Sequence, residues 1–224
     1  MPTSRPTKRE RTRSALLEAV QRTLLEEPPG ALSVPRLVAL AGVSQGTFYN
    51  YFDSLDAALD GVGLLLVAEH GRLVGEVTAG VEDPAEVFAR STRLTLTLAV
   101  QAQGYGRLLF DSGLPVDRLL IGLQVPLGRD IAAGLAAGRF RVQDPDVVIS
   151  MVSGSVLGVA IELHRRRLPL TAVGLTVERL LRDLGVGPRT SARLARLPLR
   201  VPTPRPLPLS ITTPDPTTGE GDDA

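Results

Sequence analysis

The sequence contains no cysteine, which excludes disulfides, thiolate metal ligands and thiol nucleophiles together. Long apolar runs are also missing: the longest candidate, residues 62–68, is far shorter than the roughly 18 apolar residues that a membrane span needs. The basic N-terminus is not followed by the apolar segment and the cleavage site of a signal peptide. We therefore expect a cytoplasmic protein.

An excess of charge of either sign is missing as well. Lys and Arg number 25 and Asp and Glu number 24, so the formal net charge of the 224 residues is +1. Hydrophobic residues make up 43% of the chain, which is typical of a protein with a well-formed core. These values exclude a polycation and a disordered chain, and any binding to nucleic acid must depend on where the basic residues lie.

Residues suited to catalysis are scarce. The two histidines, His70 and His164, fall on separate expected helices, and His70 has no metal-ligating residue three or four positions away. Gly61 and Gly63 lie inside an expected helix and do not follow a strand, so they do not form a phosphate-binding loop. The sequence therefore disfavours an enzyme and predicts neither a metal nor a cofactor.

Apolar residues recur with the period of about 3.6 residues of an α-helix, and no segment shows the alternation of a strand. Pro28-Pro29-Gly30 ends the first helix, and an Asp-Pro pair begins two later ones. We expect an all-α fold with helices over residues 12–27, 34–40, 44–52, 54–77, 84–103, 105–111, 116–137, 145–167 and 171–184.

The character of the chain changes after Gly185. Residues 188–216 are rich in proline and the last ten residues are acidic and polar, so we expect a largely flexible tail over 188–224. The basic piece 189–200 contains leucines that could instead pack on the body of the protein. The expected organisation is a basic arm, a small helical domain, a larger helical domain and this tail, over residues 1–11, 12–53, 54–187 and 188–224.

Residues 32–52 carry the pattern of a helix-turn-helix, which needs a short helix, a tight turn and a second helix that fits the major groove of DNA. Gly42 permits the turn, and Ser44 is placed to cap the second helix. A plain helical corner would explain the turn alone. The small core that would fix the angle between the two helices consists of Val38, Val43, Phe48 and Phe52.

The face opposite the phenylalanines is polar, which packing alone does not require. Gln45 lies in the first turn of the second helix, where side chains reach base edges first. Tyr49 and Tyr51 carry hydroxyls suited to phosphate oxygens. Ser33 and Ser44 stand at helix N-termini, where free backbone N–H groups attract phosphate. The combination favours a DNA-binding surface.

Residues 12–60 resemble the DNA-binding domain of TetR-family transcriptional regulators, above all in Ala41-Gly42-Val43-Ser44 and in residues 46–52. The resemblance implies an all-helical homodimer with an N-terminal three-helix DNA-binding domain and a larger C-terminal domain for dimerisation and effector sensing. It also implies a repressor that a small molecule releases from a pseudo-palindromic double-stranded operator. The positions that match the family's DNA contacts are Ser33, Ser44, Gln45, Gly46, Thr47, Tyr49, Asn50 and Tyr51.

One position departs from the family pattern. Many members have a lysine shortly after the recognition helix, where it meets a phosphate; here that position is Leu55, and Asp53 and Asp56 beside it are unfavourable to DNA. Basic residues near the N-terminus could replace this contact, or could belong to a solvated tail. They are Arg5, Lys8, Arg9, Arg11 and Arg13.

The larger domain carries no specific signature. Residues 145–164 are apolar and include small residues that allow close helix approach, so with 171–184 they could supply two helices to a four-helix dimer bundle. Alternatively, their apolar residues could face the core of the same subunit: Val147, Met151, Val156 and Ile161. Polar residues on apolar helices are candidates for an effector pocket, and the few aromatic residues favour an aliphatic or acyl effector. The candidates are Thr92, Thr95, Gln101, Gln103, Tyr105, Arg107 and Gln124.

Two other interpretations remain open at this stage. One is a helical interaction module that does not bind DNA, and the other is a DNA-binding regulator that responds to no small molecule. The operator, the identity of the effector and the choice between repression and activation are not encoded in any pattern of the sequence.

Overall fold

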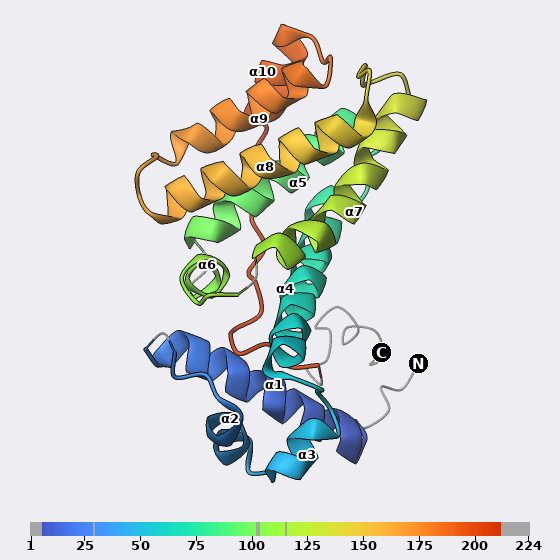
Figure 1. Cartoon of the computed structure of the whole chain (residues 1–224). Helices are drawn as coiled ribbons and strands as arrows, with labels where there is room; N and C mark the ends of the chain where they lie inside the picture. The colour runs from blue at the N-terminus through green and yellow to red at the C-terminus, as the bar shows by residue number, and fades with distance from the viewer. Residues whose placement is uncertain (1–5, 29, 102–103, 115, 212–224) are drawn as a thin grey trace, which may run out of the picture. The chain divides into compact units, whose positions relative to one another are not determined.

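The computed structural model describes residues 6–28, 30–101, 104–114 and 116–211, with the side chains of 116–119 left out. Within these ranges the chain forms ten α-helices and no strand (Figure 1), which confirms the expected all-α fold. The helices are α1 (Lys8–Glu26), α2 (Val34–Ala41), α3 (Gln45–Tyr49), α4 (Leu55–Thr78), α5 (Pro84–Gln101), α6 (Tyr105–Phe110), α7 (Val116–Ala136), α8 (Pro145–His164), α9 (Thr171–Asp183) and α10 (Pro188–Arg196).

The chain divides into two compact units. The N-terminal unit contains residues up to 66 together with those from 206 onward, and the C-terminal unit contains residues 67–205. The helix α4 begins in the N-terminal unit and continues into the C-terminal unit. Our expectation placed the end of the small domain at residue 53 and did not assign any C-terminal residue to it.

The first helix of the N-terminal unit begins at Lys8, four residues earlier than expected. Thr7 and Glu10 form a reciprocal capping box: the Thr7 hydroxyl accepts from the Glu10 N–H at 3.2 Å, and the Glu10 carboxylate accepts from the Thr7 N–H at 2.7 Å. The spacing of a threonine and a glutamate three residues apart is a sequence signal for a helix start, and our reading of the N-terminus as an arm missed it.

The basic residues of the expected arm therefore belong largely to a helix. Lys8, Arg9, Arg11 and Arg13 lie in α1, whereas Arg5 lies outside the described residues. The Arg13 guanidinium stands 5.4 Å from the centre of the Phe52 ring, so its charge is directed at the core of the motif.

The core of the C-terminal unit is organised around α5, which contacts every later helix from α6 to α10. Phe88 of α5 and Phe140 meet edge to face with their ring centres 6.0 Å apart. Gly134 of α7 is required here, because a Cβ at this position would lie 2.0 Å from the Phe140 ring.

Residues 188–211 differ from the flexible tail that we expected. Pro188 occupies the first turn of α10, where the missing N–H of proline costs nothing, and Leu194 of this helix is 1% exposed in the core. After α10, Leu199 and Val201 pack against buried leucines of α4 and α5. The Arg205 N–H then donates to the Glu69 carboxylate at 2.8 Å. The abundance of proline after α10 correctly indicates an extended chain, but contacts with α4 and α5 hold this chain in place.

The last described residues complete the N-terminal unit. Gln21 of α1 is fully buried, and its side-chain amide pairs with both backbone groups of Leu209: Nε2 donates to the carbonyl at 2.8 Å, and Oε1 accepts from the N–H at 2.7 Å. The Ile211 N–H donates to the Ser14 hydroxyl at 3.2 Å. We call this pairing of Gln21 with Leu209 the amide clamp.

Candidate DNA-binding surface and effector cavity

The helix-turn-helix of the N-terminal unit is held by a small aromatic core. Phe48 is fully buried and Phe52 is 4% exposed, with ring centres 5.7 Å apart. Gly42 has φ 66°, in the left-handed region that glycine tolerates, and it ends α2. The Ser44 hydroxyl accepts from the Thr47 N–H at 3.1 Å and thereby caps α3.

The residues that we expected to contact DNA lie at or near the surface of this motif. Tyr49 is 54% exposed and its ring meets the edge of Phe48 with centres 5.3 Å apart, so the core sets its direction. Thr47 is half-buried, and its hydroxyl lies 2.9 Å from that of Ser44. Tyr51 is also half-buried. Exposed members of the set are Ser33, Ser44, Gln45, Gly46, Tyr49 and Asn50.

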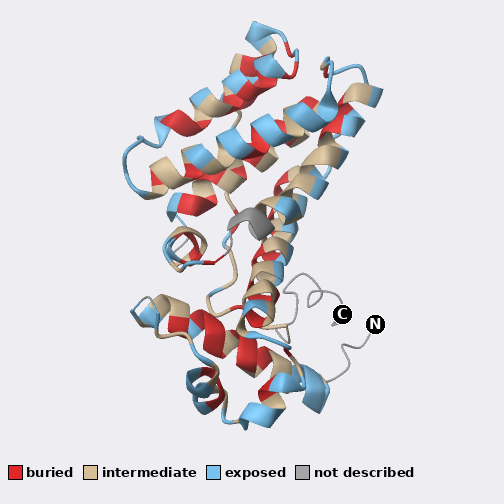
Figure 2. Ribbon diagram, in the orientation of Figure 1, coloured by how far each residue is buried: buried red, intermediate tan, exposed pale blue. Residues whose placement is uncertain are grey.

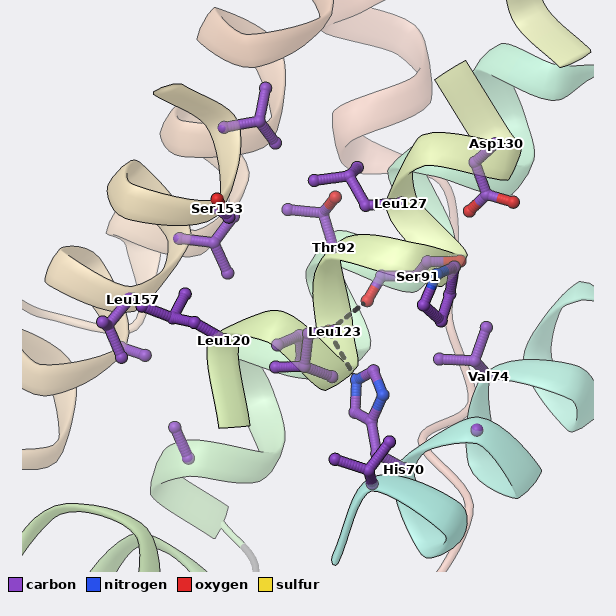
Figure 3. A pocket seen from close by; sticks show the side chains of 18 of the residues that line it. His70, Val74, Ser91, Thr92, Leu120, Leu123, Leu127, Asp130, Ser153 and Leu157 are labelled. Atoms are coloured by element: carbon purple, nitrogen blue, oxygen red, sulfur yellow. Dashed lines mark hydrogen bonds between the residues drawn. The ribbon is translucent and has the colours of Figure 1, made fainter. Parts of the chain in front are cut away.

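The C-terminal unit contains a cavity of about 350 Å³. It lies among the second half of α4 and helices α5, α6, α7 and α8 (Figure 3), and most of its wall is apolar. The polar and charged residues in the lining are His70, Ser91, Thr92, Thr95, Arg129, Asp130 and Ser153.

A chain of hydrogen bonds connects part of this polar lining. The Thr95 hydroxyl donates to the Ser91 carbonyl at 2.8 Å, and it also lies 2.8 Å from His70 Nε2. Burial lowers the pKa of His70 to about 4, so the ring is neutral near pH 7.

Burial raises the pKa of Asp130, and the charge of Arg129 opposes that rise.

The cavity includes some of the residues that we expected to bind an effector and omits others. Thr92 and Thr95 line it. Gln124 does not, but it donates to the cavity residue Ser153 at 3.1 Å. Gln101 and Arg107 are exposed outside the lining, the Tyr105 hydroxyl donates to the Arg205 carbonyl at 2.9 Å, and Gln103 lies outside the described residues.

Sequence reasoning missed His70, Ser91 and Asp130. The signal for Ser91 was available, because it shares one face of α5 with Thr95 four residues later. Asp130 is a half-buried carboxylate on a mostly apolar helix, which is a weaker signal. Ser153 was noted only as a small residue that allows helices to approach.

Two family models match the chain. The model described as "Bacterial regulatory proteins, tetR family" matches residues 16–59, and the model described as "Tetracyclin repressor-like, C-terminal domain" matches residues 83–196. The chain belongs to the TetR family. TetR proteins are DNA-binding transcriptional regulators and not enzymes, so the family removes both the enzyme and the interaction module from the alternatives.

Solved structures of TetR-family proteins have the same fold. RolR in complex with resorcinol is 26% identical, with a TM-score of 0.71 over 86% of this chain and 97% of that one. FadR of Bacillus halodurans, a fatty acid degradation regulator, is 21% identical with a TM-score of 0.56 over 79% and 97% of the two chains. NalD of Pseudomonas aeruginosa, a repressor of a multidrug efflux pump, is 18% identical with a TM-score of 0.56 over 78% and 98%. A search of curated proteins found no match.

The lowered pKa of His70 is expected to make the stability of this TetR-family protein depend on pH. In the unfolded chain the ring takes up a proton near its usual pKa of 6.5, but in the folded protein only near 4. The unfolded state therefore gains protons first as the pH falls, and the stabilisation present above pH 6.5 is lost towards pH 4. We expect His70→Gln to remove about 2 kcal/mol of the loss in unfolding free energy between pH 7 and pH 5.

Urea unfolding of the two proteins at each pH measures this difference. Because all other titrating groups are shared, their contributions cancel between the wild type and the variant. An identical fall in unfolding free energy for the two proteins would show that His70 is not the group responsible.

Proposed function

We propose that this TetR-family protein is a homodimeric repressor that leaves its operator when a small molecule occupies the cavity of the C-terminal unit. The observation that carries this proposal is the cavity itself, about 350 Å³ with charged and polar groups in an otherwise apolar wall. RolR, which has the highest similarity among the structures described above, was solved with resorcinol bound, and this supports a small-molecule effector here. A cytoplasmic location follows from such a role.

The helix α4 connects effector binding in the cavity with DNA binding by the recognition helix. Its first half belongs to the N-terminal unit, and its second half supplies Val67, His70, Gly71 and Val74 to the cavity wall. Since a helix transmits displacement along its axis with little internal deformation, a ligand that pushes on these residues can move the start of α4. That start, at Leu55, comes three residues after Phe52, which packs against Phe48 of the recognition helix α3.

A homodimer is supported by the exposed apolar face of α8. Val147 is 52% and Met151 62% exposed, so these two residues do not serve the core of their own subunit. Gly154 and Gly158 continue the same face, and a Cβ at either position would meet open space. Among the described residues, α8 is also long and apolar enough to pass the test for a membrane-crossing helix, and only 22% of its most apolar stretch is buried within the subunit (Figure 2). A second subunit would cover the apolar surface that remains exposed.

The alternative that these residues pack inside one subunit holds for part of α8. Val156 packs against two clusters of buried core residues, and Ile161 is half-buried. The neighbouring helix α9 adds Leu175, which is 68% exposed. We infer that α8 and α9 of two subunits form the four-helix interface, which would set two recognition helices on half-sites about 34 Å apart.

Variants of Gln45 and Tyr49 test base recognition and phosphate binding separately. Gln45→Ala should lower the discrimination at one operator base pair by roughly 1–3 kcal/mol, because a bidentate contact to a base edge is lost.

Tyr49→Phe keeps the ring on Phe48 but removes the hydroxyl, so it should weaken binding to all sequences by about tenfold. Fluorescence anisotropy with an operator and its single-base variants, at two salt concentrations, measures both effects.

The operator for these measurements is selected from genomic fragments around the protein's own gene. Unchanged base preference in Gln45→Ala would remove Gln45 from the recognition surface, and unchanged affinity in Tyr49→Phe would remove the phosphate contact. Repression is tested by deleting the gene: expression from the operator-bearing promoter should rise, and a fall would mean activation.

A further inference from the structure

Among the described residues that line the cavity, one side-chain hydroxyl is buried without a hydrogen-bond partner. The Ser91 hydroxyl oxygen is buried and has no hydrogen-bond partner within the described part of the chain. A buried polar atom without a partner is rare in folded proteins, because it loses its bond to water without a replacement. Because Ser91 is among the residues that line the cavity, a ligand group placed against it could supply the partner that this oxygen lacks.

The hydrogen bonds of Thr95 determine what His70 offers to a ligand. A threonine hydroxyl carries a single hydrogen, and the Ser91 carbonyl, at 2.8 Å, can only accept it. The Thr95 oxygen must therefore accept from His70 Nε2, also at 2.8 Å. A neutral imidazole with its hydrogen on Nε2 has a bare lone pair on Nδ1. His70 thus brings a hydrogen-bond acceptor to the cavity wall.

Asp130 supplies a second acceptor. Its half-buried carboxylate lines the cavity, and Figure 3 shows it on the same side of the view as His70 and Ser91. The leucine side chains of Leu120 and Leu157 lie across from them and can form no hydrogen bond. The lining therefore combines hydrogen-bond acceptors with apolar side chains, and Figure 3 shows Ser153 beside Leu157 and Val74 beside His70.

This distribution discriminates between classes of ligand. An anion would face the carboxylate of Asp130, and the cationic lining residue, Arg129, is exposed and adjacent to that carboxylate. A pure hydrocarbon or acyl chain, which the composition favoured, would cover Asp130 and His70 Nδ1 without a hydrogen bond, which is costly. A hydroxyl group donates to either acceptor and can also accept from the Ser91 hydroxyl.

We propose that the effector is a compact molecule without negative charge whose hydroxyl groups bond to His70, Ser91 and Asp130 while its apolar body lies against Leu120 and Leu157. The assignment rests on the proposed function, because it presumes that the cavity receives the effector. The cavity volume of about 350 Å³ is about twice that of the roughly 150 Å³ cavity that holds benzene. One ring with a short side chain fits this size.

The test uses three probes of similar size that differ in one group: butylphenol, butylbenzene and butylbenzoate. Calorimetric titration of the full-length protein should show butylphenol binding at least about tenfold tighter than the other two, the value of one well-formed hydrogen bond. Equal or tighter binding of butylbenzene or butylbenzoate would overturn the assignment, as would the absence of binding by butylphenol at millimolar concentration.

Variants identify the residues involved. Ser91→Ala should weaken butylphenol about tenfold and leave butylbenzene unchanged. Thr97→Ala, on the same helix but outside the lining, is the matched control and should alter neither. The nitrogen NMR shifts of His70 give an independent readout, because the chain contains only two histidines. They should show the Nε2–H form in the free protein and a change at Nδ1 when butylphenol binds; an Nδ1–H form would contradict the proposal.

The assignment and the proposed repressor function fail in different ways. If butylphenol is preferred but operator affinity does not respond to any cavity ligand, the hydroxyl-binding site stands and release by an effector is wrong. If butylbenzene is preferred and also releases the operator, the function stands and the ligand class is wrong.

Discussion

Gln21→Leu is expected to lower the unfolding free energy of the N-terminal unit by about 3 kcal/mol. The substitution preserves the volume of the side chain but removes both halves of the amide clamp, at 2.8 and 2.7 Å. The N–H and the carbonyl of Leu209 then remain buried without a partner, and each such group costs roughly 1–3 kcal/mol. Hydrogen exchange at the amides of α1, followed by mass spectrometry, measures the loss within the unit itself.

A double-mutant cycle gives this prediction its control. In a chain that ends at residue 206 the backbone groups of Leu209 are absent, so Gln21→Leu should cost much less there, with a coupling energy of about 2 kcal/mol or more. If the effects of the substitution and the truncation simply add, the clamp does not contribute to stability. Truncation alone should also expose the part of α1 that Leu209 covers, since Leu209 is 5% exposed.

Met151→Asp is expected to give a folded monomer whose operator affinity is lower by more than about a hundredfold. In the proposed dimer the two-fold axis brings two copies of position 151 into one interface, so the change buries two unpaired charges at a cost of several kcal/mol. A monomer reaches one half-site only, which accounts for the loss of affinity. Analytical ultracentrifugation gives the oligomeric state, and fluorescence anisotropy gives the affinity for operator DNA.

The chain offers a closely matched control on α7. Ile121 and Met151 are each 62% exposed, so Ile121→Asp introduces the same charge at an equally accessible apolar site. We expect this variant to remain dimeric. A monomer from Ile121→Asp together with a dimer from Met151→Asp would place the interface on α7. Both variants should keep their monomer unfolding free energy within about 0.5 kcal/mol, because neither side chain is part of a core.

The parts of the fold that sequence reasoning predicted well depend on local signals. The helix-turn-helix was recognisable because a glycine turn, a serine cap and two phenylalanines four residues apart occur within about one dozen residues, and each acts on its neighbours in the chain. The starts of α5 and α8 followed from Asp83-Pro84 and Asp144-Pro145 for the same reason. The start of α1 carried an equally local signal in Thr7 and Glu10, which could have been used.

The parts that it did not predict depend on contacts between distant residues. Gln21 and Leu209 are 188 positions apart, and Glu69 and Arg205 are 136 apart. No pattern in residues 197–211 indicates that they contact Gln21 or Glu69, so this proline-rich segment resembled a flexible tail. The cavity presents a similar difficulty, because its wall combines five helices and depends on the rotation of each helix about its own axis. Thr92 and Thr95 were found because a single helix carries both.

The amide clamp also has a consequence for synthesis of the protein on the ribosome. The first helix emerges early, but its partner Leu209 is made 188 residues after Gln21 and leaves the exit tunnel correspondingly later. The DNA-binding unit therefore cannot reach its final structure while most of the chain is still being made. A product that stops before residue 209 would keep every residue of the recognition helix and still lack the segment that completes α1, so competence to bind the operator is coupled to synthesis of the chain through Leu209.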